Sequence, residues 1–176
     1  MPNLSTRNQG EASKVNLTDV IASLMNGNSS RRTNRYPTKE EILAEPLPTH
    51  KIALLRAIKV WKKQVWAVSR GSMEDKNRAL ESLVNTMADV YDKPCNFTVN
   101  LRLPSPCYRT DSRTIVMNAS ASVISTMHEF AHHLFGHDET KACRWSVHLF
   151  RKTFPKAYAQ LVWDRHTLRK PNVLLD

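Results

Sequence analysis

The spacing of the apolar residues changes twice along the chain, and these changes limit the folds open to it. Between residues 50 and 92, apolar side chains recur every three or four positions, as on one face of a helix. After Pro94 they alternate with polar side chains over residues 97–103, which is the period of a half-buried strand. From Ser120 or Ser122 the helical period returns. We therefore expect an α+β fold that is mainly helical and has a small mixed or antiparallel sheet.

Residues that cap or end helices define the expected bounds in the first half. Thr38 and Glu41 fit a reciprocal capping pattern at the start of a short helix. A long helix is expected over residues 50–70, with Gly71 as its end. Its inward side chains would be Ile52, Leu55, Ile58, Trp61, Val65 and Val68. Ser72, with Asp75 three residues later, is expected to start the next helix, over residues 73–92.

The second half is expected to contain a second strand and three helices. Residues 114–117 form the strand candidate. The helix that follows is expected to end at Gly136, with glycine as a left-handed cap. Two further helices are expected over residues 138–153 and 156–167.

The chain is expected to consist of a tail and one domain. Residues 1–36 are polar and read as a flexible N-terminal tail. Within it, residues 17–25 have the period of a short amphipathic helix, which would be a docking helix, a pro-segment or a helix packed on the core. Residues 37–176 would form a single domain, with a helical part over 37–93 and the sheet and remaining helices over 94–176.

Composition excludes some classes of protein and suggests partners. Only four glycines occur, so no glycine-rich loop can cradle a phosphate, which argues against P-loop and dinucleotide-binding folds. The formal net charge of +10 favours nucleic acid or acidic partners. Basic residues are in excess over residues 51–93 and 137–176. Trp61 and Trp66 lie among these basic residues. Both occupy apolar positions of an amphipathic helix, so we interpret them as core residues.

The sequence predicts a cytoplasmic protein without a membrane segment. No window resembles a signal peptide, and no apolar run approaches the ~20 residues that cross a bilayer. Cys95, Cys107 and Cys143 are odd in number and widely spaced, which does not indicate a disulfide framework. Cys95 and Cys107 lack the spacing of a zinc-binding pair, and we interpret them as buried thiols.

The segment from His128 to His132 has the spacing H-E-x-x-H within an expected helix. Residues four apart share a helix face, so the imidazoles of His128 and His132 can bind one zinc ion. Glu129 is next to the first histidine, where it can take a proton from water activated by the zinc. The pattern predicts a Zn²⁺ site with Glu129 as the catalytic base and the two histidines as metal ligands.

The segment from Thr126 to Glu139, TMHEFAHHLFGHDE, resembles the active-site helix of the zincin metallopeptidases. The strand-then-helix order before it is similar to the core of that superfamily. The resemblance covers residues 96–153 and implies a zinc metalloendopeptidase that hydrolyses peptide bonds of a protein substrate. It also implies that an edge strand binds the substrate in extended form, and residues 97–103 and 113–118 are the candidates.

The third zinc ligand distinguishes the branches of the superfamily. Metzincins would have glycine at position 135 and histidine at position 138, whereas this chain has Phe135 and Asp138. Gluzincins take a glutamate from a following helix, often within E-x-x-A, and Glu139 and Ala142 match that pattern. A carboxylate in the first turn of a helix is favoured by the helix dipole. Ala142 and Ser146 are small and would let this helix pack closely on the first.

Other residues stay open as ligands or supporting groups. His137, Asp138 and His148 are alternative third ligands, although Asp138 also fits the N-cap of the following helix. His133 points about 100° away from His132 and is expected to support the site or lie at the surface. A peptidase also needs a donor to the oxyanion formed at the scissile carbonyl. The candidates for this donor are Tyr108, Arg144, His148 and Tyr158.

Two groups of small zincins share features with this chain. SprT-like zincins are DNA-associated proteases, which suits the basic charge, although their third ligand is usually a later histidine. ImmA/IrrE-type zincins cleave DNA-binding repressors and use a glutamate, and the H-E-F-A-H helix is similar to theirs. An alternative function is therefore a nucleic-acid-associated protein that binds DNA through its basic helices. It would be either a SprT-like protease or a non-catalytic accessory protein.

Overall fold

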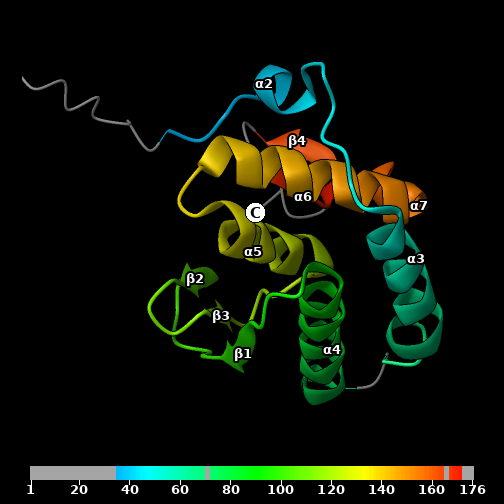
Figure 1. Ribbon diagram of the computed structural model, residues 1–176, viewed down its shortest axis with the longest axis vertical. Coiled ribbons are helices and arrows are strands. Elements are labelled where there is room, and N and C mark those ends of the chain that lie inside the picture. The colour runs from blue at the N-terminus through cyan, green and yellow to red at the C-terminus, as the bar shows by residue number, and fades with distance from the viewer. Residues whose placement is uncertain (1–34, 70–71, 165–166, 172–176) are drawn as a thin grey trace, which may run out of the picture. The chain divides into compact units, whose positions relative to one another are not determined.

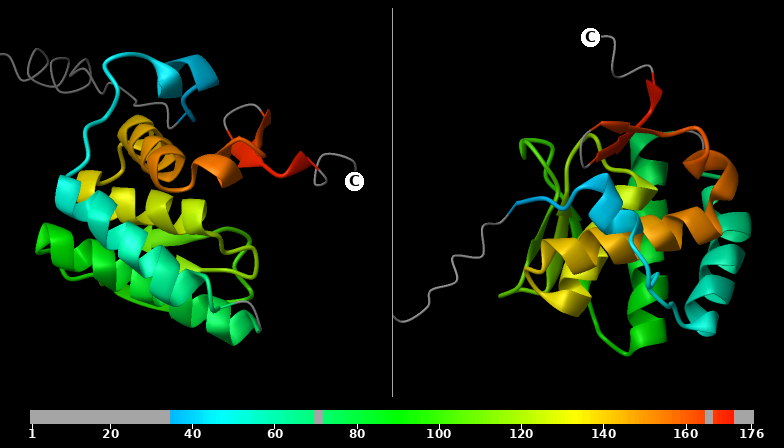
Figure 2. Two further views of the ribbon diagram at one scale, coloured as in Figure 1. Left: turned by 90° about the vertical axis from the view of Figure 1, so that its right-hand side faces the viewer. Right: turned by 90° about the horizontal axis from the view of Figure 1, so that it is seen from above.

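Helix α5 (Val123–Phe135) lies at the centre of the fold in a computed structural model that describes residues 35–69, 72–164 and 167–171 (Figure 1). Helix α6 (Glu139–Thr153) packs along one side of α5. Helix α4 (Met73–Tyr91) and a three-stranded sheet pack on the other side (Figure 2). The fold is therefore α+β and mainly helical, as the sequence predicts.

The first helices differ from expectation in one respect. Helix α2 (Lys39–Leu43) packs against α6, and α3 (Ile52–Trp61) packs against α4. The single helix expected over residues 50–70 is wrong, because the chain passes at Lys62–Trp66 into a π-helical turn, η1. A wider turn shifts the angular position of later side chains. Val68, which follows the turn, is accordingly 76% exposed. Ile52, in the first turn of α3, was also expected to point inward but is 68% exposed.

Local capping explains where the other helices begin. Reciprocal capping boxes join Thr38 to Glu41 at α2, Ser72 to Asp75 at α4 and Ser122 to Ser125 at α5. The side chain of Asp138 caps α6 by accepting from the amide of Lys141. Each cap satisfies helix amides that have no partner within the helix. These four N-caps confirm the helix starts expected from sequence.

The main sheet is mixed and small. It comprises β1 (Asn96–Val99), β2 (Cys107–Arg109) and β3 (Thr114–Met117), in the order β1-β3-β2. Strand β3 is central, parallel to β1 and antiparallel to β2, so Ile115 pairs with both Phe97 and Tyr108. The strand expected over 97–103 ends early at Val99, and Leu101 is 63% exposed in the turn that follows.

The C-terminal helix expected over residues 156–167 is wrong. The chain forms only the short helix α7 (Pro155–Tyr158) and then a hairpin of β4 (Val162–Asp164) and β5 (Thr167–Arg169). A short apolar run does not distinguish a helix from a strand by its period alone. Trp163 and Leu168 of the hairpin pack against a small buried cluster formed by Ile42 of α2 with Cys143 and Val147 of α6.

One principal core lies where α4, α5, α6 and β3 meet. Its fully buried side chains include Leu80, Leu83, Met87, Ile115, Met117, Met127, Phe130 and Leu149. Trp61 belongs to it, as expected, and its indole N–H donates to the carbonyl of Ala79 at 3.2 Å. Trp66 is half-buried and stacks on Trp61. This core holds α5 rigidly from both sides.

Some expectations fall outside the described residues. The amphipathic segment at 17–25, the rest of the expected tail before Arg35 and the expected helix end at Gly71 are among them. No helix within the described ranges is long and apolar enough to cross a lipid bilayer. The three cysteines are free. Cys95 is buried, as expected, whereas Cys107, also expected to be buried, is only partly buried.

Candidate metal centre

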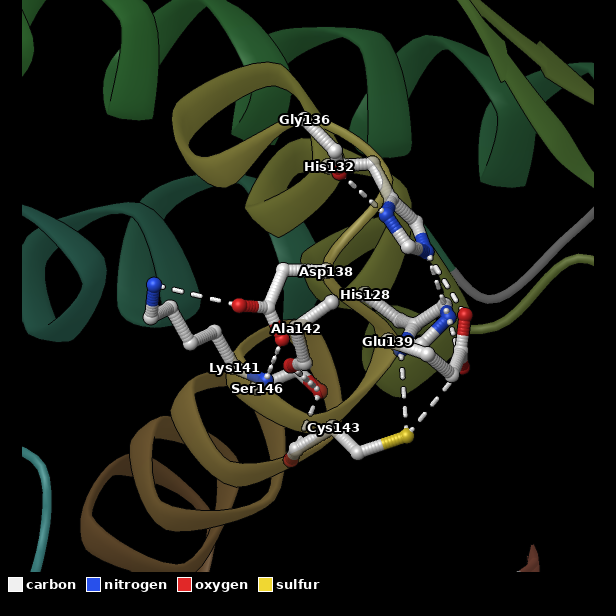
Figure 3. A network of polar contacts seen from close by, with 9 residues as sticks. All are labelled: His128, His132, Gly136, Asp138, Glu139, Lys141, Ala142, Cys143 and Ser146. Atoms are coloured by element: carbon white, nitrogen blue, oxygen red, sulfur yellow. Dashed lines mark hydrogen bonds and ion pairs between the residues drawn. The ribbon is translucent and has the colours of Figure 1, made fainter. Parts of the chain in front are cut away.

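Three polar side chains from α5 and α6 converge on one point. His128 and His132 lie one turn apart on α5, and their Nε2 atoms are 3.2 Å from each other. The Glu139 carboxylate, in the first turn of α6, lies against both imidazoles (Figure 3). Its Oε1 is 3.2 Å from His128 Nε2, and its Oε2 is 3.2 Å from His132 Nε2. The structure thus brings Glu139 to both histidines, as expected of a third ligand.

The short turn between the two helices makes this convergence possible. Gly136 ends α5 with φ 67° and ψ −143°, so it has the positive φ expected but not the left-handed helical conformation. The chain then reverses, and Asp138 starts α6. Ala142 and Ser146 are buried where α6 lies on α5, as their small size predicts. Close packing of the two helices brings the first turn of α6 to the histidine face of α5.

The three contacts fit a shared cation better than a set of hydrogen bonds. An imidazole Nε2 carries at most one proton and cannot donate to two partners at once. In a tetrahedral zinc site with bonds near 2.0–2.1 Å, ligand atoms lie about 3.3–3.4 Å apart. The Nε2–Nε2 separation of 3.2 Å agrees with that spacing, and each Nε2 lies 3.2 Å from a different oxygen of the Glu139 carboxylate. Two imidazole nitrogens and a carboxylate are also ligands that zinc prefers.

The backbone fixes the tautomer of His132. Its Nδ1 lies 2.8 Å from the carbonyl oxygen of Gly136, which can only accept. Nδ1 therefore carries the proton of the neutral ring, and the lone pair of Nε2 is directed at Glu139 and His128. Orientation of a ligand histidine by a carbonyl group is a common feature of metal sites.

Electrostatics couple Glu139 to the histidines. Burial alone would raise the pKa of Glu139, but hydrogen bonds with His128 and His132 outweigh it and hold that pKa well below its usual range. Burial alone would lower the pKa of His132, but Glu139 and the carbonyl of Gly136 raise it above its usual value. In the absence of a cation, Glu139 is therefore an anion that favours a positive charge between the three side chains.

Glu129 lines the same cleft as His128 and Glu139. Its side chain is buried, and burial raises its pKa above the usual range despite the nearby histidines. The backbone of Tyr108 in β2 forms a hydrogen bond with its carboxylate. A carboxylate with a raised pKa can both accept and return a proton near neutral pH. The structure thus places Glu129 in the cleft that contains His128 and Glu139.

Cys143 was not predicted as part of the site. It lies one turn after Glu139 on α6, and its thiol is 3.3 Å from Glu139 Oε1 and 3.9 Å from His128 Nδ1. His128, Glu139 and Cys143 thus form a second possible set of metal ligands. We favour the set with His132, because the thiol faces the Nδ1 side of His128 and because burial, followed by Glu139, raises its pKa and disfavours the thiolate.

Tyr36 is a second site residue that sequence reasoning missed. It precedes α2 and lines the cleft of about 360 Å³ that contains His128, Glu129 and Glu139. Burial raises the pKa of its phenol, and the charges of Glu139, Cys143 and Glu129 raise it further, which locates the hydroxyl near the acidic groups. No local pattern connects this residue to a motif some ninety residues later, so only the fold reveals it.

Two predicted oxyanion donors, His148 and Tyr158, do not line the cleft. His148 is buried against α2, where its Nε2 lies 3.1 Å from the carbonyl oxygen of Ile42. Tyr158 packs on the core, and the guanidinium of Arg151 lies over its ring. Each side chain is occupied by packing between elements, so neither fits the role proposed from sequence.

The remaining candidates for a ligand or an oxyanion donor also lie away from the cleft or contact other groups. Arg144 donates to the carbonyl oxygens of Ala44 and Pro46 and so anchors the chain after α2. His137 is exposed and does not line the cleft. The hydroxyl of Tyr108 contacts Nδ1 of His133 at 2.8 Å, which places His133 on the side of α5 that faces the sheet. His133 therefore supports the packing of β2, consistent with a supporting role.

The edge strand beside the cleft also differs from expectation. Residues 113–118 include β3, which is central and cannot be an edge. Strand β1, from the other candidate segment, contacts α4. Strand β2 is the edge strand that contacts α5, and the backbone of its Tyr108 reaches Glu129. Its brevity, Cys107–Arg109, explains why no periodic signal identified it.

Similarity to known proteins was sought in three ways. Comparison with protein-family models, with curated proteins and with solved structures found no match. The functional conclusion therefore depends on the residues and their geometry.

Proposed function

We propose that this protein is a zinc-dependent peptidase that hydrolyses peptide bonds in a protein substrate. The observation that carries the proposal is the convergence of His128, His132 and Glu139 at mutual separations of 3.2 Å. Glu129 in the same cleft adds the group that hydrolysis requires. The resemblance of the H-E-x-x-H helix to that of zincins, and of Glu139 and Ala142 to the E-x-x-A pattern of gluzincins, supports the same conclusion.

His128, His132 and Glu139 would hold the zinc ion. Three protein ligands leave one position of a tetrahedral ion open, as in catalytic rather than structural zinc sites. When bound, zinc lowers the pKa of water and polarises a carbonyl group. The side chains of His128, His132 and Glu139 are 14–22% exposed, so substrate can reach them while most of the bulk water is excluded.

Glu129 and Tyr36 would act on the reacting groups. Glu129 would accept a proton from the water that attacks the scissile carbonyl carbon and would return it to the leaving amine nitrogen. The hydroxyl of Tyr36 faces the same cleft and would donate to the carbonyl oxygen as it gains charge. The outer edge of β2 would pair with the extended substrate next to Glu129.

Metal removal tests this proposal directly. We expect purified protein to contain about one zinc ion per chain and to hydrolyse an unfolded test protein. A chelator such as 1,10-phenanthroline should abolish hydrolysis, and added zinc should restore it. Metal analysis and the appearance of new amino termini are the measurements. Full hydrolysis by metal-free protein, or no zinc uptake after reconstitution, would contradict the proposal.

Zinc affinity is expected to fall as the pH decreases through the pKa of His132. A histidine ligand must be deprotonated to bind zinc. The pKa of His132 lies above its usual value of 6.5, so protons compete with zinc from a higher pH than for an ordinary histidine. We expect a loss of about tenfold in affinity per pH unit below that pKa. Chelator competition between pH 5.5 and 8 measures this slope, and constant affinity over the range would exclude His132 as a ligand.

We also propose a cytoplasmic location, which the three free cysteines support because such thiols persist in reducing compartments. Association with DNA stays a prediction that rests on the net charge of +10. The structure offers little for base stacking on the basic helix α3 and the turn that follows. There Trp61 is buried, and Lys62 is engaged by the carbonyl of Thr153 and the ring of Phe154.

A further inference from the structure

A second cavity, of about 580 Å³, lies beyond the N-terminal end of α5. We call it the distal pocket. Its walls come from η1, α4, α5, α6 and the hairpin, and its apolar surface includes Trp66, Phe150, Phe154 and Leu161. The π-helical turn of η1 presents Trp66 to this space, and such turns are frequent at functional sites. The volume is within the range of ligand-binding pockets.

The distal pocket adjoins the cleft of the candidate metal centre. Ser122, Ile124 and Leu168 line both spaces. They belong to the start of α5 and to β5, and the hairpin lies over the N-terminal half of α5 (Figure 2). From His128 back to Ser122 the helix rises about 9 Å, which an extended polypeptide covers in about three residues. A chain bound at the metal centre can therefore enter the distal pocket without a turn.

Two lysines give the distal pocket a positive charge. Lys76 of α4 is half-buried in its wall, and Lys170 follows β5. Neither forms an ion pair with any of the residues that the structure describes. Neither lines the metal cleft, so of these two spaces both lysines line the distal pocket alone. Apolar walls with two unpaired ammonium groups fit a ligand that is apolar and carries an acidic group.

We propose that the distal pocket binds the substrate segment that extends from the scissile bond along α5, and that it selects apolar residues accompanied by an acidic side chain. This inference rests on the proposed peptidase function. Ser120 lines the metal cleft, and its hydroxyl, which donates to Oδ1 of Asn118, can still accept from a backbone amide of an extended peptide. The substrate class is thus a polypeptide with an apolar and acidic segment a few residues from the cleaved bond.

Peptide binding tests the inference without requiring catalysis. Full-length, zinc-loaded protein carrying Glu129→Gln is titrated with two fluorescent decapeptides that share an apolar centre. One peptide ends in two glutamates and the other in two lysines. We expect about tenfold tighter binding of the acidic peptide at low salt, decreasing as salt is added. The double variant Lys76→Glu, Lys170→Glu should reverse the preference. Lys39→Glu, Lys59→Glu is the matched control, with the same change in net charge at exposed lysines away from the pocket, and should keep it.

The outcomes separate this inference from the peptidase function. Equal affinity for both peptides, or a preference that the control reduces as much as the pocket variant, would overturn the distal pocket as a selective site. Displacement of the acidic peptide by dodecanoate at lower concentrations than by unlabelled peptide would also overturn it, because the site would then select a lipid anion. The preference for the acidic peptide can depend on Lys76 and Lys170 even if the zinc-loaded wild type cleaves no substrate. That result would support the distal pocket and exclude the peptidase function. Cleavage of both peptides by the wild type at equal kcat/KM would instead support the peptidase function and overturn the distal pocket as a selective site.

Discussion

Replacement of Glu129 by glutamine is expected to reduce kcat for an unfolded protein substrate by about 10²- to 10⁴-fold, the range of a general acid–base group. Glutamine has the same shape and can keep the contact with the backbone of Tyr108, but it cannot accept the proton of the attacking water. Because Glu129 is not among the three converging ligands, zinc content should stay near that of the wild type. Measuring turnover and bound zinc on the same sample distinguishes loss of proton transfer from loss of the metal.

A control variant distinguishes the loss of proton transfer from a general effect of removing a negative charge. Glu81→Gln, at an exposed position of α4, removes the same charge far from the cleft and should leave both turnover and zinc content unchanged. Turnover of Glu129→Gln equal to that of the wild type would show that Glu129 does not transfer the proton. Loss of zinc in the same variant would instead indicate that Glu129 binds the metal.

Replacement of Glu139 by alanine is expected to weaken zinc binding by roughly 70- to 900-fold. A structural zinc site with four protein ligands contributes roughly 10–16 kcal/mol, so one ligand accounts for roughly 2.5–4 kcal/mol. The variant also removes the anion that holds a positive charge between His128 and His132. Competition against a chromogenic chelator measures the change, and hydrolysis should be lost in parallel at limiting zinc.

Cys143→Ser is the matched control on the same helix. It keeps a side chain of similar size one turn after Glu139 and removes only the sulfur ligand. If His132 and not Cys143 completes the site, zinc affinity should change by tenfold or less, as for groups that support a ligand. Loss of zinc in Cys143→Ser as well as in Glu139→Ala would favour the alternative ligand set of His128, Glu139 and Cys143. Retention of zinc by Glu139→Ala would exclude Glu139 as a ligand.

The helix starts were predictable because they depend on local chemistry. Thr38, Ser72, Ser122 and Asp138 each satisfy amides within the next few residues, and no distant contact is needed for that. The strand period at residues 97–99 was likewise local. The π-helical turn, the early end of β1 and the hairpin after α7 were not predictable, because packing against other elements decides between conformations of similar intrinsic preference.

The same division applies to the candidate site. His128, Glu129 and His132 could be identified from helical spacing alone, and Glu139 from the short turn and the E-x-x-A pattern. Cys143, one turn after Glu139, could have been found from the same spacing rule. Tyr36 and the edge position of β2 required the fold, since they approach α5 from segments distant in sequence. His148 and Tyr158 lie away from the cleft, which sequence could not show, because it does not reveal that His148 faces α2 or that Tyr158 of α7 packs on the core.

The turn at Gly136 gives the metal centre an unusual independence from the rest of the fold. The groups that would hold zinc all come from one helix–turn–helix segment, so the ion would close only a short loop and add little to the cohesion of distant elements. The core of α4, β3 and the buried faces of α5 and α6 contains none of the three side chains that would hold zinc. We therefore expect depletion of zinc to leave the protein folded but inactive. Cellular zinc supply could set the fraction of active molecules without synthesis or degradation of the chain.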